Sequence, residues 1–355
     1  MKCLLAIIPV IVCACLNGPA LSQTLPIAEP ALLPISAADA QLRGELSRRC
    51  GSAFTVIGTR NFQIIYETDD AWARRTAELL EKAQEQFYRD FGDAGLKPLK
   101  NPLFWVCFSK KQDFNNYAIA TDQMDMSWLD CYYSTRTNRV VLQRPAAPKT
   151  PELKFARAEV IDFSELHPAQ TTASGLGLDT IKATHETAHQ LSFNSGLLRR
   201  GVMYPMWVTE GISTNFEADK QGRFGMGRIN PIRRDDLLDA RGYGRLLPLA
   251  ELAVLTQVPV GEGTYTNDLY AQSWGFFRFL YDEHRGQLGH YLRELAQFEP
   301  GRRSPWMITW EFQQAFGPAG GLEQGWVAFL DRMKSLRQQE QLPPAQLLAR
   351  HENAK

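Results

Sequence analysis

The chain has 355 residues, of which 44% are hydrophobic and 22% are charged. This composition is ordinary for a soluble globular protein, and the length suits one large domain or two lobes that share a cleft. The 39 Lys and Arg residues balance the 39 Asp and Glu residues, so the formal net charge is +0. A neutral chain has no electrostatic basis for binding nucleic acid or an anionic membrane surface.

The N-terminus has the pattern of a secretory signal peptide over residues 1–22. A single positive charge at Lys2 precedes a short apolar run, and small residues at Ala20 and Ser22 mark a cleavage site. The run is too short to span a bilayer comfortably, and no later stretch is apolar enough for a transmembrane helix. A lipoprotein signal, with a lipid anchor at Cys15, is the alternative. We therefore expect an exported protein, periplasmic or secreted, with no transmembrane span.

Three cysteines follow the signal peptide: Cys50, Cys107 and Cys131. They allow one disulfide and one spare thiol, and the sequence leaves the pairing open. Cys107 lies within an apolar run, where the alternative is a small buried hydrophobic residue. No two of them have C-x-x-C spacing, so we do not expect a zinc site built from thiolates.

The rest of the chain is expected to form a single two-lobed domain at residues 46–350, after an extended leader at residues 23–45 without a fold of its own. Strand and helix patterns assign residues 46–177 to a sheet lobe, and helical periodicity assigns residues 178–350 to a helical lobe. The predicted fold class is therefore α+β. Residues 145–177 have no clear period and are expected to form a long loop, which in compact domains often borders a functional site.

The sheet lobe contains two predicted β-hairpins, at residues 54–66 and 129–143, because short apolar runs there flank turn residues. A strongly apolar run at 102–108 predicts a strand in the centre of the sheet. Apolar residues with a period of about 3.6 predict a helix at residues 71–91, and a short helix is expected at 111–117. We expect these elements to form a mixed or antiparallel sheet with helices beside it.

The helical lobe begins with a helix that Asp179-Thr180 can cap and that Gly196 can end. After a short connection, Pro205 opens a second helix that continues through Phe216. Residues 221–247 are rich in Gly, Arg and Asp and are expected to be irregular. Further helices are expected at about 248–256, 266–285, 287–298, 307–316 and 322–339.

The first helix of this lobe contains His185-Glu186-Thr187-Ala188-His189, which has the form H-E-x-x-H. Two imidazoles with this spacing lie one turn apart on the same helix face, close enough to bind one metal ion. Glu186 is one step round the helix and points toward the open coordination position, where a general base belongs. The alternative is a coincidental match. We expect His185 and His189 to bind one Zn²⁺ ion per chain.

A catalytic zinc site needs three protein ligands and one open position. Glu210 is the candidate third ligand, because it lies early on the second helix, one helix-turn-helix return after His189. Gly211 beside it is expected to leave room for close packing against the first helix. The alternative for Glu210 is a solvated carboxylate that complements the helix dipole. Glu217, two turns later on the same face, is the reserve ligand, and we otherwise expect it to support a ligand or to be exposed.

Together these segments resemble the gluzincins, the thermolysin-like and aminopeptidase-like branch of zinc metallopeptidases. The nearer resemblance is to uncharacterised secreted bacterial proteins with a peptidase MA-like domain, and it rests on His185 to Gln190, Phe193-Asn194-Ser195-Gly196 and Pro205-Met206-Trp207-Val208-Thr209-Glu210-Gly211. It implies a zincin-like cleft between the lobes and a peptide or protein substrate. The chain departs from the thermolysin pattern, since the spacing to Glu210 is slightly longer and Thr214 stands where an Asp is expected. This departure leaves open which side chain orients the zinc histidines.

The resemblance also implies a mechanism of peptide hydrolysis. Glu186 acts as the general base toward a zinc-activated water and passes the proton to the leaving amine. Gluzincins often stabilise the oxyanion with a Tyr or His from a later helix, and Tyr270 is the candidate here, ahead of His284 and His290. The alternative for Tyr270 is ordinary packing of its ring. In this class an edge strand above the zinc also binds extended substrate, a role for residues 139–143, which otherwise form an ordinary hairpin strand.

Other functions stay open from the sequence. The chain is alternatively a catalytically inactive zinc-binding or substrate-binding envelope protein on a peptidase-like scaffold, or a scaffold without metal. Glu186 argues against the inactive form, since a purely structural zinc site needs no base. A serine hydrolase is set aside because no G-x-S-x-G elbow is present, and nothing positive supports a glycosidase. Arg199 and Arg200 are expected to be solvated rather than to bind a substrate carboxylate, and His167 and His351 have no assigned role.

Overall fold

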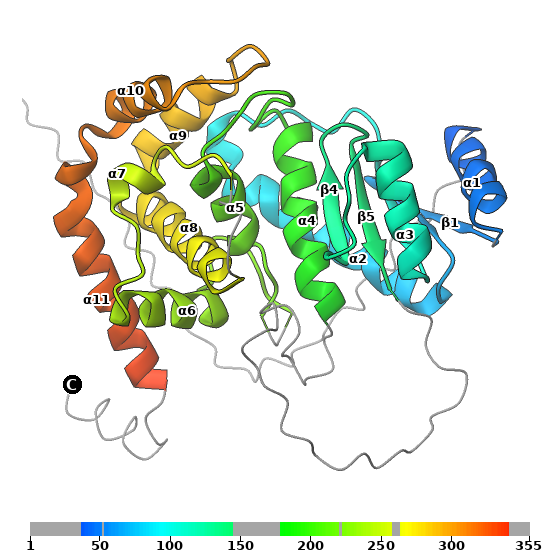
Figure 1. The fold of residues 1–355 in the computed structure, drawn as a ribbon, viewed down its shortest axis with the longest axis horizontal. Helices are drawn as coiled ribbons and strands as arrows, with labels where there is room; N and C mark the ends of the chain where they lie inside the picture. The colour runs from blue at the N-terminus through cyan, green and yellow to red at the C-terminus, as the bar shows by residue number, and fades with distance from the viewer. Residues whose placement is uncertain (1–36, 52, 145–177, 220–221, 258–262, 341–355) are drawn as a thin grey trace, which may run out of the picture.

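The computed structural model describes residues 37–51, 53–144, 178–219, 222–257 and 263–340. Several features predicted from the sequence lie outside these residues: the signal peptide at 1–22, Cys15, leader residues 23–36, the loop at 145–177, His167 and His351. The fold is α+β, as predicted, with a sheet in the N-terminal part and mostly helices in the C-terminal part (Figure 1). No helix within the described ranges has both the length and the apolar character needed to cross a membrane.

The described part of the chain forms one mixed sheet from β1 (Thr55–Gly58), β2 (Phe62–Tyr66), β3 (Leu103–Phe108), β4 (Cys131–Ser134) and β5 (Arg139–Gln143). The strand order is β1-β2-β3-β5-β4. The β1–β2 and β4–β5 pairs are antiparallel and confirm both predicted hairpins, whereas β3 pairs in parallel with β2 and with β5. β3 is the central strand, as its uninterrupted apolar run predicts.

The position of β5 corrects the prediction that residues 139–143 form an edge strand. β5 pairs in parallel with β3, where Val140 lies opposite Trp105, and its other side pairs with β4. The side chains of Val140, Val141 and Leu142 are fully buried, as expected for a strand that is covered on both faces. The strand at this edge of the sheet is therefore β4, on the side nearest the helical part (Figure 1).

The described residues contain these α-helices: α1 (Ala37–Cys50), α2 (Asp70–Asp90), α3 (Lys111–Tyr117), α4 (Leu178–Asn194), α5 (Met206–Asn215), α6 (Pro231–Gly242), α7 (Leu249–Leu252), α8 (Gly263–Glu283), α9 (Arg285–Leu295), α10 (Pro305–Phe316) and α11 (Glu323–Glu340). Short 3₁₀ segments lie at Gly92–Ala94 and Ala319–Leu322, and a π-helical segment lies at Ala118–Asp122. α2 confirms the helix predicted at residues 71–91. Asp69 caps its start, because the Asp69 carboxylate accepts a hydrogen bond from the backbone N–H of Trp72 at 2.6 Å.

Helices cover both faces of the sheet, because successive side chains of a strand point to opposite faces. Ile64 and Trp105 belong to the face that packs against α2 and α4 and continues into the main hydrophobic core. Ile65 and Val106, one residue further along the same strands, belong to the opposite face, which α1 and α3 cover. Cys107 is buried on the first face, which confirms its interpretation as a small core residue.

One helix forms where the sequence predicts an extended leader, and another is shorter than predicted. α1 begins at Ala37, so the extended leader does not reach residue 45. Leu42 and Leu46 of this helix are buried against the sheet, and this packing is the physical reason for the difference. α7 covers only Leu249–Leu252, although the apolar pattern predicts a helix over 248–256.

A third helix, α6, forms where residues 221–247 are expected to be irregular. Asn230 caps this helix, since its side-chain oxygen accepts hydrogen bonds from two backbone N–H groups of the first turn. Pro231 occupies the first turn, where its missing N–H has no cost. Leu237 and Leu238 are buried, and the packing of α6 against α8 stabilises the helix.

α4 lies between the sheet and the helices α5 and α8 (Figure 1). Its C-terminal end is closed by Gly196, which has a φ of 80° and therefore adopts a left-handed conformation that suits glycine. α5 packs closely on α8 at Gly211, where a Cβ atom would lie 2.6 Å from Cβ of Phe277 and 2.8 Å from the carbonyl oxygen of Ser273. Gly211 therefore permits α5 to pack closely on α8, whereas the sequence predicts close packing on α4.

Candidate metal centre

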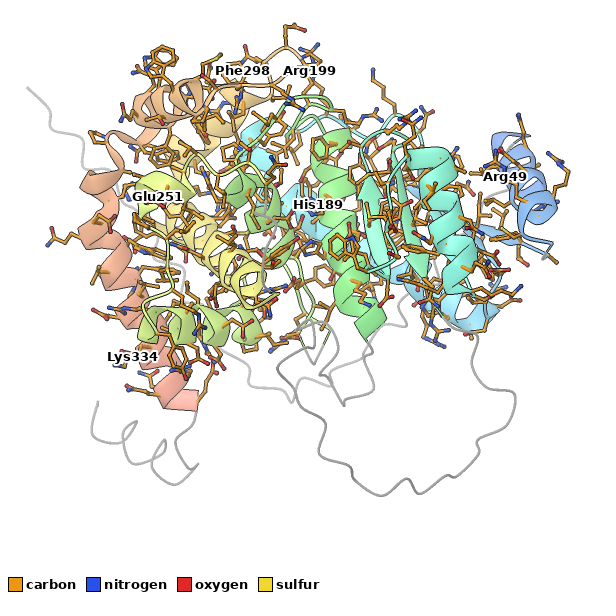
Figure 2. All side chains as sticks on the ribbon, viewed as in Figure 1. Arg49, His189, Arg199, Glu251, Phe298 and Lys334 are labelled. Carbon is orange, nitrogen blue, oxygen red and sulfur yellow. The ribbon has the colours of Figure 1, made fainter. Side chains whose placement is uncertain are left out.

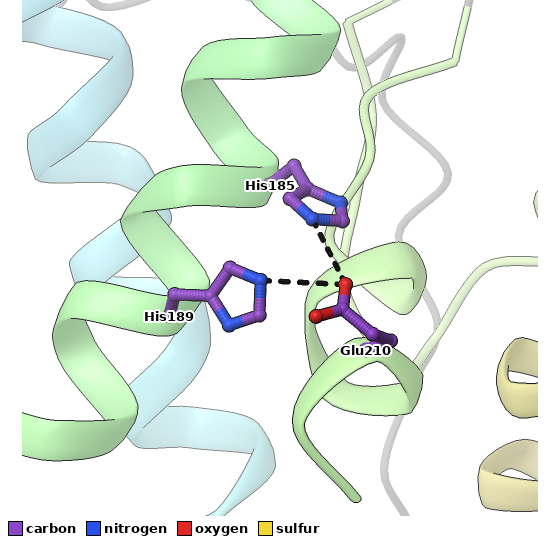
Figure 3. Close-up of side chains that lie close together, drawn as sticks. All are labelled: His185, His189 and Glu210. Carbon is purple, nitrogen blue, oxygen red and sulfur yellow. Dashed lines mark ion pairs between the residues drawn. The ribbon is translucent and has the colours of Figure 1, made fainter. Parts of the chain in front are cut away.

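The two histidines of the H-E-x-x-H segment lie on the face of α4 that is turned toward α5 (Figure 3). Their ring centroids are 4.9 Å apart, as expected for residues separated by one helical turn. Glu210 of α5 extends toward both rings, and Nε2 of His185 and Nε2 of His189 each lie 3.4 Å from Oε2 of Glu210. Figure 2 shows His189 in the middle of the molecule, between the sheet and the helical part.

These three side chains meet the geometric requirement for ligands of one metal ion. One candidate ligand atom from each of His185, His189 and Glu210 lies within 4.8 Å of the others. The side chains are mostly buried, with 13, 14 and 17% of their areas exposed. Oε2 of Glu210 is buried and accepts no hydrogen bond from any described residue. A buried oxygen in this state is costly unless a positive group satisfies it, so the site fits a cation.

The electrostatics of the three groups also favour positive charge at this point. Burial raises the pKa of Glu210, but the imidazoles of His189 and His185 outweigh burial and hold the pKa of this carboxyl well below its usual range. Burial lowers the pKa of His185, but its contacts with Glu210 and Glu217 outweigh burial and raise the pKa to about 10. The carboxylates of Glu210 and Glu217 therefore stay ionised and stabilise positive charge at this point, whether it is a protonated imidazole or a metal ion.

His185 is oriented by Glu217, which follows the C-terminal end of α5. Nδ1 of His185 lies 3.2 Å from Oε1 of Glu217. This contact keeps a proton on Nδ1, so Nε2, which faces Glu210, is the nitrogen that would lose its proton to bind a metal ion. Glu217 therefore supports a ligand, one of the two expectations for this residue. Thr214, at the position where an Asp is expected, takes no part, because its hydroxyl donates to the backbone oxygen of Glu210 at 2.6 Å.

Two residues hold Glu217 in place, and sequence reasoning misses both. Arg233 of α6 donates from Nε to Oε2 at 2.8 Å and from Nη2 to Oε1 at 2.5 Å, and Asn230 donates to Oε2 at 2.9 Å. Burial raises the pKa of Glu217, but the charge of Arg233 outweighs burial and lowers the pKa to about 2. The sequence signal that could have located this segment is Asn230-Pro231, which is a helix start.

Buried side chains on the opposite side of α4 fix this helix against the sheet. Oε1 of Gln190 accepts a hydrogen bond from Nε1 of Trp105 at 3.1 Å, and its Nε2 donates to the backbone oxygens of Phe104 and Asn138. Asn194, one turn later, exchanges hydrogen bonds with the side chain of Asn138 in the β4–β5 turn. The positions of His185 and His189 are therefore set by the sheet as well as by α5.

A pocket of about 170 Å³ opens beside His185, and it is lined by Glu186 and Tyr270 among others. The ring of Tyr270, on α8, lies 6.3 Å from the ring of His185, and the guanidinium of Arg233 lies 5.5 Å from the Tyr270 ring centre. The negative charge of Glu210 and burial raise the pKa of Tyr270 well above its ordinary value, so its hydroxyl stays protonated. The structure thus brings Glu186 and Tyr270 to the same pocket.

Other candidates from the sequence lie elsewhere. His284 caps α9 and contacts the side chain of Gln287 at 2.8 Å, and His290 is exposed, as expected for surface or helix-end histidines. Arg199 forms an exposed ion pair with Glu299, and Arg200 is exposed, as the sequence analysis expects for both arginines. None of the four lines the pocket beside Glu186.

Over residues 179–301 the chain is similar to a sequence family described as "Protein of unknown function (DUF1570)". This segment runs from α4 to the residues after α9, and it includes every side chain of the candidate site: Glu186, His185, His189, Glu210, Glu217, Asn230, Arg233 and Tyr270. The family description states no activity. No curated protein matches the chain.

Proposed function

We propose that this protein is an exported zinc-dependent hydrolase of the metallopeptidase type, which cleaves peptide bonds. The observation that carries the proposal is the convergence of His185, His189 and Glu210 on one point, together with the pocket that His185 shares with Glu186 and Tyr270. The gluzincin resemblance of the H-E-x-x-H segment supports the same reading.

The donor set favours zinc over other common ions. Two imidazoles and one carboxylate suit Zn²⁺, whereas Mg²⁺ and Ca²⁺ take mainly oxygen ligands. His185, His189 and Glu210 would hold the ion through Nε2, Nε2 and a carboxylate oxygen, and three protein ligands leave a position open for chemistry. When bound, zinc supplies a Lewis acid that polarises a substrate carbonyl and acidifies water.

The other residues of the site have separate tasks in hydrolysis. Glu186 lies next to His185 on α4 and lines the pocket, so its carboxylate accepts the proton of the attacking water and returns it to the leaving amine. The protonated hydroxyl of Tyr270 donates a hydrogen bond to the oxyanion that develops on the carbonyl oxygen. Glu217 keeps the imidazole of His185 in one tautomer and orientation throughout.

Two measurements test the proposal. Protein purified without chelators should contain about one zinc per chain, and His189→Ala should lose it, since the site then has only two ligands. Glu186→Gln should keep the zinc and lose hydrolysis of a mixed peptide substrate by at least about 100-fold, the contribution typical of a general base. Unchanged hydrolysis in Glu186→Gln would refute the peptidase mechanism. Full zinc content without any hydrolysis by the wild type would instead indicate the inactive zinc-binding alternative.

A further inference from the structure

A second pocket, with a volume of about 680 Å³, lies at the C-terminal end of α4. It is lined by the segment 97–103 that leads into β3, by Asn138 just before β5, and by residues from the end of α4 and the loop beyond it. It shares no lining residue with the pocket beside Glu186, and Figure 2 shows Arg199, which lines it, at the upper edge of the molecule, away from His189. The candidate metal centre therefore does not account for this pocket.

Every charged side chain that lines this pocket from the described residues is basic. These side chains belong to Lys97, Lys100, Arg199 and Arg200. Arg199 is paired with Glu299, whereas the other three form no ion pair with any described residue. The dipole of α4 contributes roughly half a negative charge at this end of the helix, which is small beside three cations. The pocket therefore has a local excess of positive charge, although the chain as a whole is neutral.

Lys97 is held in place by the end of α4. Its backbone N–H donates to the carbonyl oxygen of Ser195 at 2.7 Å, and its own carbonyl oxygen accepts a hydrogen bond from the Tyr88 hydroxyl at 2.6 Å. Its aliphatic stem passes over Gly196, where an added Cβ atom would lie 3.4 Å from Cδ of Lys97. The segment Phe193-Asn194-Ser195-Gly196, which supplies no candidate metal ligand, thus positions this lysine. A cation that is already positioned loses less conformational entropy when it binds an anion.

We propose that this pocket binds a soluble small molecule through a phosphate monoester group. Such a group carries a charge of about −1.5 to −2 at pH 7, so it neutralises more of the excess positive charge than one carboxylate does. Ammonium and guanidinium groups form strong charge-assisted hydrogen bonds to phosphate oxygens. The volume of about 680 Å³ leaves room for the rest of the ligand, since small-molecule sites typically measure about 300–1,000 Å³. The proposal does not depend on peptide hydrolysis, because no candidate metal ligand lines this pocket.

The test titrates the protein as purified with inorganic phosphate, glucose 6-phosphate, glucose and acetate, by isothermal calorimetry at one fixed ionic strength. We expect both phosphates to bind at least about 10-fold more tightly than acetate, because a phosphate group has about twice the charge of a carboxylate. Glucose should not bind. The affinity for the phosphates should fall as the salt concentration rises, since salt screens exposed charges. Failure of both phosphates to bind would overturn the proposal.

Three variants locate the bound phosphate. Lys97→Met keeps an apolar stem over Gly196 but removes the ammonium, so the dissociation constant of glucose 6-phosphate should rise by about 10-fold. Lys334→Met is the matched control, because it removes one exposed positive charge from α11, at the opposite corner of the molecule in Figure 2, and it should change the constant less than about 2-fold. His189→Ala removes a candidate metal ligand and should leave the constant unchanged, since His189 does not line this pocket.

Other outcomes of these measurements contradict the proposal. If Lys97→Met loses stability in urea but binds phosphate as the wild type does, Lys97 only complements the dipole of α4. Equal losses in Lys97→Met and Lys334→Met would indicate a general charge effect, and loss of binding in His189→Ala would place the phosphate at the metal centre. Vesicles of phosphatidylcholine with phosphatidic acid present the same group on a membrane. Sedimentation with these vesicles, without binding of the soluble phosphates, would assign the phosphate to a lipid and overturn the proposal of a soluble ligand.

Discussion

Replacement of Glu217 by Met separates its role at the metal centre from its role in folding. Glu217 is 7% exposed, receives hydrogen bonds from Arg233 and Asn230, and contacts Nδ1 of His185. Met has a similar length but accepts no strong hydrogen bond, so His185 loses the group that selects its tautomer. We expect the zinc dissociation constant of Glu217→Met to rise about 10- to 100-fold, which corresponds to roughly 1.4–2.8 kcal/mol.

The same substitution has a second cost, because it leaves Arg233 buried without a counter-charge. Removing one partner of a buried ion pair lowers the unfolding free energy by about 3–5 kcal/mol. The pair formed by Arg303 and Glu311 provides the matched control, since both side chains are buried, with Nη1 of Arg303 2.9 Å from Oε2 of Glu311, and neither lines the pocket beside Glu186. Glu311→Met should keep its zinc affinity and lose less stability than Glu217→Met, because burial raises the pKa of Glu311 despite the charge of Arg303.

Two assays distinguish the loss of zinc affinity from the loss of stability. Zinc dissociation constants are measured by competition with a chromophoric chelator at fixed neutral pH. Unfolding free energies are measured in urea with excess chelator, because bound metal would otherwise add to the stability of the folded state. Glu217→Asp is a milder variant that keeps a carboxylate beside Arg233 but withdraws it from His185, so it should lose zinc affinity with a smaller loss of stability. An unchanged zinc dissociation constant in Glu217→Met, or an equal change in Glu311→Met, would refute the orienting role.

Two further predictions concern stability. Gly211→Ala places a Cβ atom 2.6 Å from Cβ of Phe277, so the unfolding free energy in urea should fall by about 1–3 kcal/mol, whereas Gly227→Ala, with no heavy atom within 4 Å of its added Cβ, should change it by less than about 0.5 kcal/mol. Burial raises the pKa of Asp236 from 3.8 to about 6, so the folded state binds this proton more tightly than the unfolded state, and stability falls as the pH rises through this range. Asp236→Asn should remove that fall and be more stable at neutral pH by roughly 1–3 kcal/mol, and identical pH profiles of stability for the two proteins would contradict this assignment.

Local sequence patterns predict the parts of the structure that depend on neighbours in the chain. His185 and His189 lie together because the helical period alone places them one turn apart, and β3 is central because its residues are apolar on both faces. Glu210 is a harder case, since its position depends on how α5 folds back on α4. The spacing after His189, the early position of Glu210 on its helix and Gly211 beside it predict that Glu210 reaches the histidines. The structure brings its carboxylate within 3.4 Å of both imidazoles, although Gly211 packs on α8.

Features that depend on distant pairing could not be predicted in this way. A hairpin signal does not tell which of its two strands joins the rest of the sheet, and β5 is the inner strand only because it pairs with β3. A glycine at position 211 predicts that another segment packs closely there, but the sequence does not indicate which one. In the structure that segment is α8, at Phe277. The apolar pattern does not predict α6, because four charged residues, Arg233 to Asp236, interrupt its period. The helix-start signal at Asn230-Pro231 indicates this helix more clearly.

Part of the wall of the pocket beside Glu186 comes from segments that lie far along the chain from the candidate metal ligands. His185 and His189 belong to α4 and Glu210 belongs to α5, whereas Trp128 precedes β4 and Ile232 lies in the first turn of α6. Under the proposed function, a change at Trp128 or Ile232 would alter the pocket without altering a candidate metal ligand. Trp128 even lies outside the segment shared with the sequence family, so two proteins that agree over that segment can still accept different substrates.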